Sequence, residues 1–190
     1  MLSAQTRDEV TAQAMTRLHK HGCTMKNILA TDEAELASLL HPVGMYRKKA
    51  GYIKKATQIL VDKFDSDVPS NLTDLMSLPG VGEKMALLTL QSAWGKIEGI
   101  AVDTHVHRIS NRLGWFDKET KQPTQTRKKL EEIFPKDMWE ELNHLLVGFG
   151  QQQCRPVKPL CATCLNKSIC PVGKKSSDKV SPYFESESDD

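Results

Sequence analysis

A lysine, an aspartate and a group of cysteines are the residues of this 190-residue chain that could do chemistry. Lys84 follows the pentapeptide LPGVG at 78–82, and Asp103 lies 19 positions after Lys84 in the run AVDTHVH. An amine can act as a nucleophile, a carboxylate can assist proton transfer, and grouped thiolates can bind a metal or a metal cluster. The grouped cysteines fall within 17 residues near the end of the chain: Cys154, Cys161, Cys164 and Cys170.

The pentapeptide before Lys84 has the chemistry of a tight turn between two helices. Proline fixes one φ angle, and Gly80 and Gly82 can both take positive φ. Glycines leave backbone N–H groups uncovered, and such groups at a helix N-terminus bind anions such as a DNA phosphate without regard to base sequence. The pattern therefore predicts a helix-hairpin-helix phosphate site, with a plain connection between helices as the alternative.

Lys84 is expected in the first turn of an apolar helix over 83–94. The positive end of the helix dipole acts against the ammonium form there, which makes the nucleophilic free amine more accessible. A solvated surface lysine is the alternative interpretation. Asp103 heads another expected helix, where it can cap the N-terminus and hold its carboxylate in a fixed direction. A metal site made by Asp103, His105 and His107 lacks further ligands in the sequence.

The spacing of the grouped cysteines is C-x6-C-x2-C-x5-C. In an intracellular chain such a group favours metal binding over disulfides. Zinc sites usually join two close pairs of ligands, whereas one CxxC flanked by two single cysteines suits an iron–sulfur cubane. The spacing alone leaves zinc as an alternative. Cys23, remote from the group, is expected to be a small buried residue.

Apolar residues recur at helical spacing along most of the chain, and no strand pattern occurs, so we expect an all-α fold. Over 45–64 the predicted helix is amphipathic, with Arg47, Lys48, Lys54 and Lys55 on a basic face. A linker is expected at 114–123. The predicted helices cover 6–20, 31–40, 45–64, a short segment ending at 78, 83–94, 103–113 and 135–149.

Charge and composition set outer limits on function. The net charge is +2, but residues 176–190 carry −4, so residues 1–175 carry +6. A moderately basic body permits contact with a polyanion. Residues 173–190 have too few apolar side chains for a core, and we expect a disordered acidic tail there. The chain shows no secretion signal and no apolar run of about 18 residues, which predicts a soluble intracellular protein.

Three motifs, in this order, resemble endonuclease III, most closely its eukaryotic homologues: LPGVGEKMA at 78–86, VDTHVHRISNRLGW at 102–115 and the four-cysteine loop. The resemblance covers residues 2 to about 172. It implies an all-α helix-hairpin-helix DNA glycosylase fold, with a six-helix barrel domain at 1–97 and a smaller helical iron–sulfur domain at 98–172. Lys84 and Asp103 are then expected to face the cleft between these domains.

The resemblance also implies a bifunctional DNA N-glycosylase and AP lyase that removes oxidised pyrimidines. The target nucleotide is flipped out, Lys84 attacks C1′, the base leaves, and the resulting Schiff base undergoes a β-elimination that nicks the strand. Asp103 would stabilise the cationic sugar and assist proton transfers. A [4Fe-4S] cluster, with a structural and DNA-positioning role, would be held by Cys154, Cys161, Cys164 and Cys170.

Three further positions match family residues that contact DNA. Gln5, in LSAQ at 2–5, matches the residue that fills the vacated space in the duplex. Met45 matches the wedge that enters the base stack, where the family often has leucine, and a core or turn methionine is the alternative. His105, in the Asp103 motif, is also expected to contact DNA.

By the same resemblance, the expected partner is damaged double-stranded DNA, bound by a monomer in the nucleus or the mitochondrion without membrane attachment. Family members have a longer N-terminal stretch that packs partly on the cluster domain. We expect this chain to lack that stretch: either it is a shortened isoform, or uncovered apolar surface weakens its folding and cluster retention. Two alternatives stay open: a monofunctional glycosylase of the same superfamily, such as an adenine-specific mismatch enzyme, and a truncated non-catalytic DNA-binding isoform.

Overall fold

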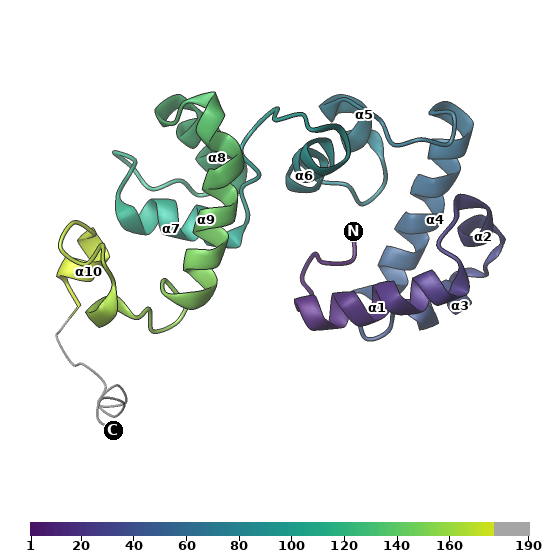
Figure 1. Cartoon of the computed structure of the whole chain (residues 1–190), viewed down its shortest axis with the longest axis horizontal. Helices are drawn as coiled ribbons and strands as arrows, with labels where there is room; N and C mark the ends of the chain where they lie inside the picture. The colour runs from purple at the N-terminus through teal and green to yellow at the C-terminus, as the bar shows by residue number, and fades with distance from the viewer. Residues whose placement is uncertain (177–190) are drawn as a thin grey trace, which may run out of the picture. The chain divides into compact units, whose positions relative to one another are not determined.

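The computed structural model describes residues 1–176, and within that range the chain consists of helices and connecting turns without any strand. The predicted all-α class is therefore confirmed. The chain divides into two compact units, Met1–Glu98 and Gly99–Asp190. Figure 1 shows the order of the helices along the chain.

The first unit is built around its longest helix. The helices α2 and α3 both pack on α4, α1 packs on α3, and α5 pairs with α6. Leu36, Leu40 and Ala50 are fully buried in one core cluster, and Ala86 and Leu90 are fully buried in a second. The helices of this unit are α1 (Asp8–His21), α2 (Met25–Ala30), α3 (Glu33–Leu40), α4 (Tyr46–Lys63), α5 (Leu72–Ser77) and α6 (Glu83–Trp94).

Polar side chains start several of these helices, because they accept bonds from backbone N–H groups that have no partner inside the helix. Asp32 accepts from Ala34 N at 2.8 Å and caps α3, which confirms the helix start predicted there. Thr24 and Asn71 cap α2 and α5 in the same way. Helix α2 was not among the predicted helices, since six residues are too few to show a helical period.

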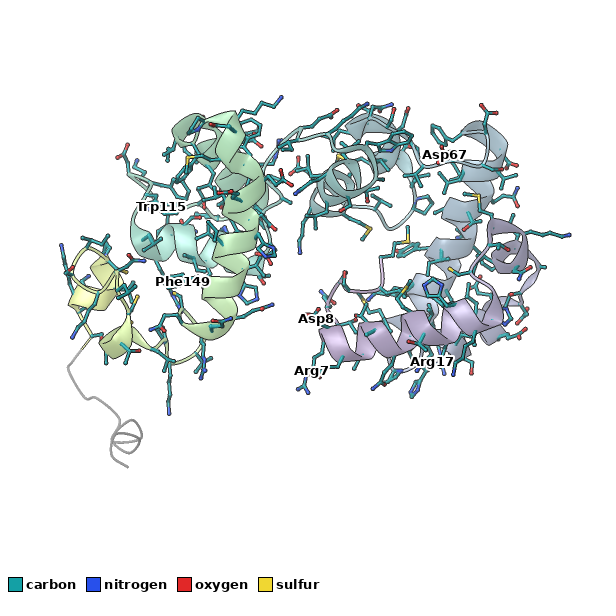
Figure 2. All side chains as sticks on the ribbon, viewed as in Figure 1. Arg7, Asp8, Arg17, Asp67, Trp115 and Phe149 are labelled. Atoms are coloured by element: carbon teal, nitrogen blue, oxygen red, sulfur yellow. The ribbon has the colours of Figure 1, made fainter. Side chains whose placement is uncertain are left out.

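Two long cationic side chains bind carbonyl groups at the ends of helices. Arg17, labelled in Figure 2, donates from α1 to the carbonyls of Leu39 at 2.8 Å and His41 at 2.5 Å, at the end of α3. Lys54 donates from α4 to two carbonyls at the end of α2. Lys54 is half-buried, whereas Arg47, Lys48 and Lys55 of the predicted basic face are exposed.

The second unit is organised by α7, which packs against α8, α9 and α10. Its core contains Ile100, Val106, Ile109 and Leu130, all fully buried. Trp115 and Phe149, labelled in Figure 2, pack against this core. Its described elements are α7 (Thr104–Leu113), α8 (Pro123–Ile133), the short 3-10 helix η1 (Lys136–Met138), α9 (Trp139–Gln152), the 3-10 helix η2 (Cys161–Thr163) and α10 (Pro171–Lys174).

A buried polar network ties α7 to α8 and to the segment between them. Thr126, fully buried on α8, is bonded through its hydroxyl to His107 Nδ1 at 2.6 Å and to Thr120 Oγ1 at 2.5 Å. Asn111 Oδ1, on α7, accepts from Thr120 N at 2.9 Å. His107 is thus committed to this network. Helix α8 was not among the predicted helices, because only Thr126 and Leu130 of its residues are buried and its apolar period is therefore weak.

Two further predictions are wrong. Cys23 is exposed between α1 and α2 and not buried. The predicted tail starts at residue 173, but Gly173 belongs to α10 and is buried so closely that a Cβ there would lie 2.8 Å from the carbonyl oxygen of Lys167. Residues 177–190, the rest of the predicted tail, lie outside the described residues. No helix in the described range has both the length and the apolar character needed to cross a membrane.

Replacing Thr126 with valine tests the buried network. The Thr126→Val variant keeps the side-chain volume but leaves His107 Nδ1 without its partner, so we expect the free energy of unfolding to fall by about 1–3 kcal/mol. The control variant Thr124→Val changes an exposed threonine of the same helix and should stay within about 0.5 kcal/mol of the wild type. Urea unfolding of all three proteins gives the comparison, and equal midpoints would show that the network adds no stability.

Candidate active site and cysteine loop

Asp103 is the N-cap residue of α7, as predicted. Its Oδ1 accepts a hydrogen bond from Val106 N at 2.8 Å, and its side chain is half-buried. The backbone carbonyl of Asp103 accepts from His107 N at 3.0 Å, which starts the helical hydrogen-bond ladder. The carboxylate is therefore held in one direction at the positive end of the helix dipole.

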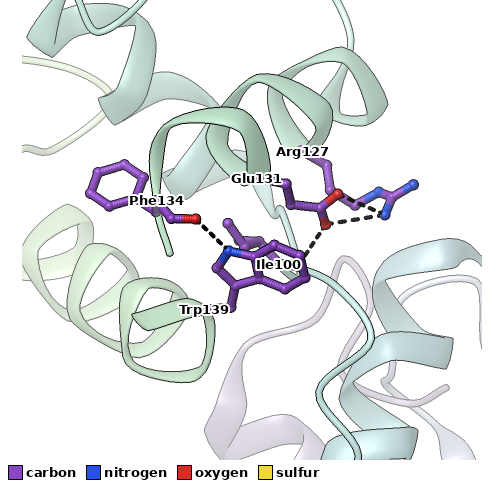
Figure 3. Close-up of polar contacts among 5 residues, drawn as sticks. All are labelled: Ile100, Arg127, Glu131, Phe134 and Trp139. Carbon is purple, nitrogen blue, oxygen red and sulfur yellow. Dashed lines mark hydrogen bonds and ion pairs between the residues drawn. The ribbon is translucent and has the colours of Figure 1, made fainter. Parts of the chain in front are cut away.

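The segment that leads to Asp103 is held by a carboxylate of α8. Glu131 accepts a hydrogen bond from Ile100 N at 2.9 Å and forms an ion pair with Arg127 at 3.1 Å, as Figure 3 shows. Ile100 is fully buried. The ion pair orients the carboxylate that receives the Ile100 amide, so α8 fixes the approach of the chain to Asp103.

Helix α9 supports the same segment. Asn143 Nδ2 donates to the carbonyl of Ala101, two residues before Asp103. Trp139 Nε1 donates to the carbonyl of Phe134 at 2.9 Å and so joins the end of α8 to the start of α9 (Figure 3). Both helices are thereby held in place to support the segment.

The predicted hairpin joins α5 to α6, and Lys84 lies in the first turn of α6 with its side chain exposed. Gly80 has a φ of 77°, and a Cβ there would lie 2.8 Å from the ring of Tyr52, so both backbone conformation and space require glycine. Gly82 has a φ of −98°, so of these two glycines only Gly80 takes positive φ. As the N-cap of α6, Gly82 offers no side chain to the first-turn amides.

The space above Gly82 is open. Apart from its chain neighbours Val81 and Glu83, no group of the described chain lies within 4 Å of the place that a Cβ of Gly82 would take. An anion can therefore approach the N-terminus of α6, where the backbone N–H groups and the helix dipole favour negative charge. Lys84 stands two residues further along the same helix turn.

Gln5 and Met45 are brought together although 40 positions separate them. Both are exposed, and both have a φ of 54° in the left-handed region that residues with a Cβ rarely adopt. Met45 is the N-cap of α4, and Gly44 packs so closely on the carbonyl of Gln5 that a Cβ at Gly44 would lie 2.6 Å from that oxygen. The alternative of a core methionine is wrong, because 52% of Met45 is exposed.

The four grouped cysteines all line one cavity in the second unit, and all four thiols are half-buried and free. The Sγ atom of Cys170 accepts from Gly173 N at 3.5 Å. N–H donors directed at sulfur suit thiolates that carry negative charge in a metal cluster. No group of three or more potential ligands among the described residues is arranged to hold a single metal ion.

Two arginines of α7 hold the cysteine loop. Arg112 Nη1 donates to Cys154 Sγ at 3.5 Å and to the carbonyl of Arg155 at 2.7 Å, and Nη2 donates to the carbonyl of Pro156 at 2.8 Å. Arg108 Nη2 donates to the carbonyl of Cys154 at 2.8 Å. Burial lowers the pKa of Arg108, and the neighbouring charge of Arg112 acts in the same direction. The loop is thus fixed to the helix that Asp103 begins.

His105 faces the inside of the second unit. It is half-buried, its Nδ1 lies 3.1 Å from Arg108 Nη2, and a Cβ at Gly150 would lie 2.6 Å from the same nitrogen. Gly150 is therefore the residue that makes room for the imidazole on α9. The predicted DNA contact of His105 stays a prediction, and this packing gives the side chain a structural role as well.

Three side chains that support these sites were not found from the sequence: Lys49, Arg108 and Arg112. A signal for Lys49 was present, because it lies four residues before Ile53 and seven before Ala56 on the apolar face of α4. Arg108 and Arg112 are four residues apart and so share one face of α7, but the sequence does not say what that face contacts.

Comparison with known proteins identifies relatives over most of the chain. A family described as "HhH-GPD superfamily base excision DNA repair protein" matches residues 1–136. The chain is 53% identical over 174 residues to endonuclease III-like protein 1 of Bos taurus, covering 92% of this chain and 57% of that protein. Its identity to the Mus musculus protein of the same name is 55% over 174 residues, covering 92% of this chain and 58% of that protein.

A solved structure has the same fold. It is described as a trapped endonuclease III–DNA covalent intermediate in an estranged-adenine complex, and it matches with a TM-score of 0.87 at 36% sequence identity, over 92% of this chain and 81% of that chain. This similarity confirms the predicted helix-hairpin-helix glycosylase fold. The chain spans less than three fifths of the length of the two curated relatives.

Two substitutions of Asp103 separate its capping role from its charge. Asp103→Ala removes the acceptor for Val106 N–H, and we expect the free energy of unfolding to fall by about 0.5–2 kcal/mol. Asp103→Asn keeps an oxygen acceptor of the same reach and should stay close to the wild type. Thermal or urea unfolding measures both. Equal stability of the alanine and asparagine variants would contradict the capping role.

Proposed function

The chain belongs to the endonuclease III family of the HhH-GPD superfamily of base excision DNA repair proteins, and we propose that it is a bifunctional DNA N-glycosylase and AP lyase acting on oxidised pyrimidines. The observation that carries the proposal is an exposed lysine in the first turn of the helix that follows the glycine hairpin. An endonuclease III–DNA covalent intermediate has been trapped in a protein of the same fold. A lysine amine can form such a bond.

In the proposed reaction, the free amine of Lys84 attacks C1′ of a nucleotide that has been flipped out of the duplex. The bond from Nζ to C1′ forms as the glycosidic bond breaks, and the oxidised base leaves with the bonding electrons and takes up a proton. Loss of a proton from the nitrogen and opening of the sugar ring give a Schiff base. Removal of a proton from C2′ then expels the 3′ phosphate oxygen, and water releases Lys84.

Asp103 is proposed to stabilise the positive charge that develops on the sugar and to assist the proton transfers. The bond from Val106 N–H supports this role, because it orients the carboxylate before the substrate binds. A group that is already oriented stabilises a transition state without reorganisation at the moment of reaction. The contacts of Glu131 and Asn143 with the preceding segment limit its movement further.

DNA is proposed to bind through its phosphate backbone and through the space that the flipped nucleotide leaves in the base stack. The amides at Gly80 and Gly82 would receive a phosphate at the N-terminus of α6, independent of base sequence. Gln5 would fill the space left by the flipped nucleotide, and Met45 would enter the base stack as the wedge. The exposure of Gln5 and Met45 on one part of the first unit supports these roles.

We also propose that Cys154, Cys161, Cys164 and Cys170 hold a [4Fe-4S] cluster. When bound, the cluster would supply a cross-link between segments of the second unit and no chemistry at the sugar. A shared cavity and half-buried thiols fit this cofactor. The spacing favours the cubane over zinc, because zinc sites usually join two close pairs of ligands and this loop has one CxxC flanked by two single cysteines.

The proposed substrate is damaged double-stranded DNA, bound by a monomer of this protein in the nucleus. Solved relatives include endonuclease III bound to DNA both covalently and non-covalently, which supports DNA as the partner. A second location in the mitochondrion is part of the proposal. A monofunctional glycosylase, which would cleave the base without a covalent intermediate, is the alternative that the next experiment separates.

Borohydride trapping tests the lysine chemistry. Reduction converts a Schiff base into a stable bond. Wild-type protein is mixed with duplexes that carry an oxidised pyrimidine, an oxidised purine or an abasic site, and it should give a covalent protein–DNA band with the oxidised pyrimidine and the abasic site. Lys84→Gln should abolish the band because the nucleophile is gone. The matched control Lys63→Gln changes an exposed lysine at the end of α4 and should trap like the wild type.

Wild-type protein that releases the base but gives no trapped band would contradict the lyase activity, because a monofunctional glycosylase behaves in this way. Trapping only on a duplex with an oxidised purine would remove the pyrimidine claim. No activity at all in folded, cluster-loaded protein would favour a non-catalytic DNA-binding module.

Metal analysis tests the cluster. Purified protein should be brown and contain about four iron atoms per chain, with visible absorbance from the cluster. Cys161→Ser should lose iron and colour, whereas Cys23→Ser, at an exposed cysteine outside the loop, should keep both. Colourless protein with about one zinc per chain would instead establish the zinc alternative.

A further inference from the structure

A buried lysine lies beside the two exposed residues proposed to probe DNA. Lys49 is 5% exposed and is therefore shielded from direct contact with a DNA backbone. Its ammonium group donates to the carbonyls of Leu2 at 2.9 Å and Ala4 at 2.5 Å, and to Thr6 Oγ1 at 3.2 Å. One side chain of α4 thus binds three groups of the turn that contains Gln5.

Thr6 connects this turn to the turn that contains Met45. Its Oγ1 accepts from Gly44 N at 3.1 Å, and its hydroxyl donates to the carbonyl of Ala4 at 3.2 Å. Gly44 also lies against the carbonyl of Gln5 so closely that a Cβ could not be placed there. The residues before Gln5 are anchored as well, because the side chain of Leu2 is buried in the core.

Gln5 and Met45 need such support. Both have the left-handed backbone conformation, which is unfavourable for residues with a Cβ and persists only when the surrounding structure holds it. Both are exposed, so packing of their own side chains does not hold them. A wedge and a filling residue must also keep their places while the base stack resists them.

We propose that Lys49 and Thr6 are positioning residues that lock the turns of Gln5 and Met45 into one rigid pair, and that this lock sets the preference for DNA with an extruded or missing nucleotide over intact duplex. The inference rests on the proposed function, because only DNA containing a vacated space uses the pair. Lys49 acts through the two turns and makes no contact with the substrate itself.

The Thr6 hydroxyl gives the sharpest test, since it can be removed without loss of volume. Dissociation constants of the cluster-loaded 190-residue protein are measured for a duplex with a tetrahydrofuran abasic analogue and for the intact duplex. Thr6→Val should lower the ratio of the two affinities by about tenfold or more, since small misplacements of positioned groups have large effects. Thr6→Ser keeps the hydroxyl and should restore the wild-type ratio.

Substitutions of two neighbouring lysines test whether Lys49 holds the turn that contains Gln5. Lys49→Met should lower the affinity ratio as Thr6→Val does. Lys48→Met removes the exposed neighbour on the same helix, and any lost phosphate contact should weaken binding to both duplexes equally and leave the ratio unchanged. Should Lys49→Met not fold, the Thr6 variants decide the question.

Hydrogen exchange supplies a readout that does not depend on DNA. The amide of Gly44 should exchange faster in Thr6→Val than in the wild type or in Thr6→Ser, because its acceptor is gone. The lock would be overturned if Gly44 exchanged in Thr6→Val as it does in the wild type. It would also be overturned if the wild type preferred the abasic analogue and Thr6→Val kept the same affinity ratio. A wild type without any such preference would overturn the proposed function first, and the lock with it.

Discussion

One hydrogen bond, from Val106 N to Asp103 Oδ1, begins the helix around which the described part of the second unit is organised. That helix, α7, packs against α8, α9 and α10, and near its other end Arg112 binds the backbone of the cysteine loop. The carboxylate and the loop are therefore fixed by opposite ends of the same 10-residue helix. The cluster proposed for this loop would thus stabilise the helix that Asp103 begins.

Helix α4 has the corresponding place in the first unit. Its N-cap is Met45, its buried Lys49 holds the turn of Gln5, and its Tyr52 packs on Gly80 in the hairpin before α6. The groups proposed to enter the duplex and the hairpin proposed to bind its backbone are therefore supported by one element. Rigid helices place these groups more reproducibly than loops alone could.

The sequence predicts elements with strong local signals and misses contacts that depend on the fold. The helix over 83–94 and the cap at Asp103 follow from a glycine hairpin, an apolar run and an aspartate at a helix start. Helix α2 is too short and α8 too polar for periodicity to reveal them. Cys23 was misplaced because burial depends on neighbours distant in sequence. Lys49 shows the same limit, since its acceptors lie more than 40 positions away.

The central proposal is that the amine of Lys84 forms the covalent bond to the sugar and that the carboxylate of Asp103 assists. A crystal structure of the protein reduced onto abasic DNA with borohydride measures this directly. The account predicts a covalent bond from Lys84 Nζ to C1′, with the Asp103 carboxylate within about 4 Å of the same deoxyribose, where it can stabilise positive charge. A sugar bonded to another amine, or an Asp103 remote from the bonded sugar, would contradict it.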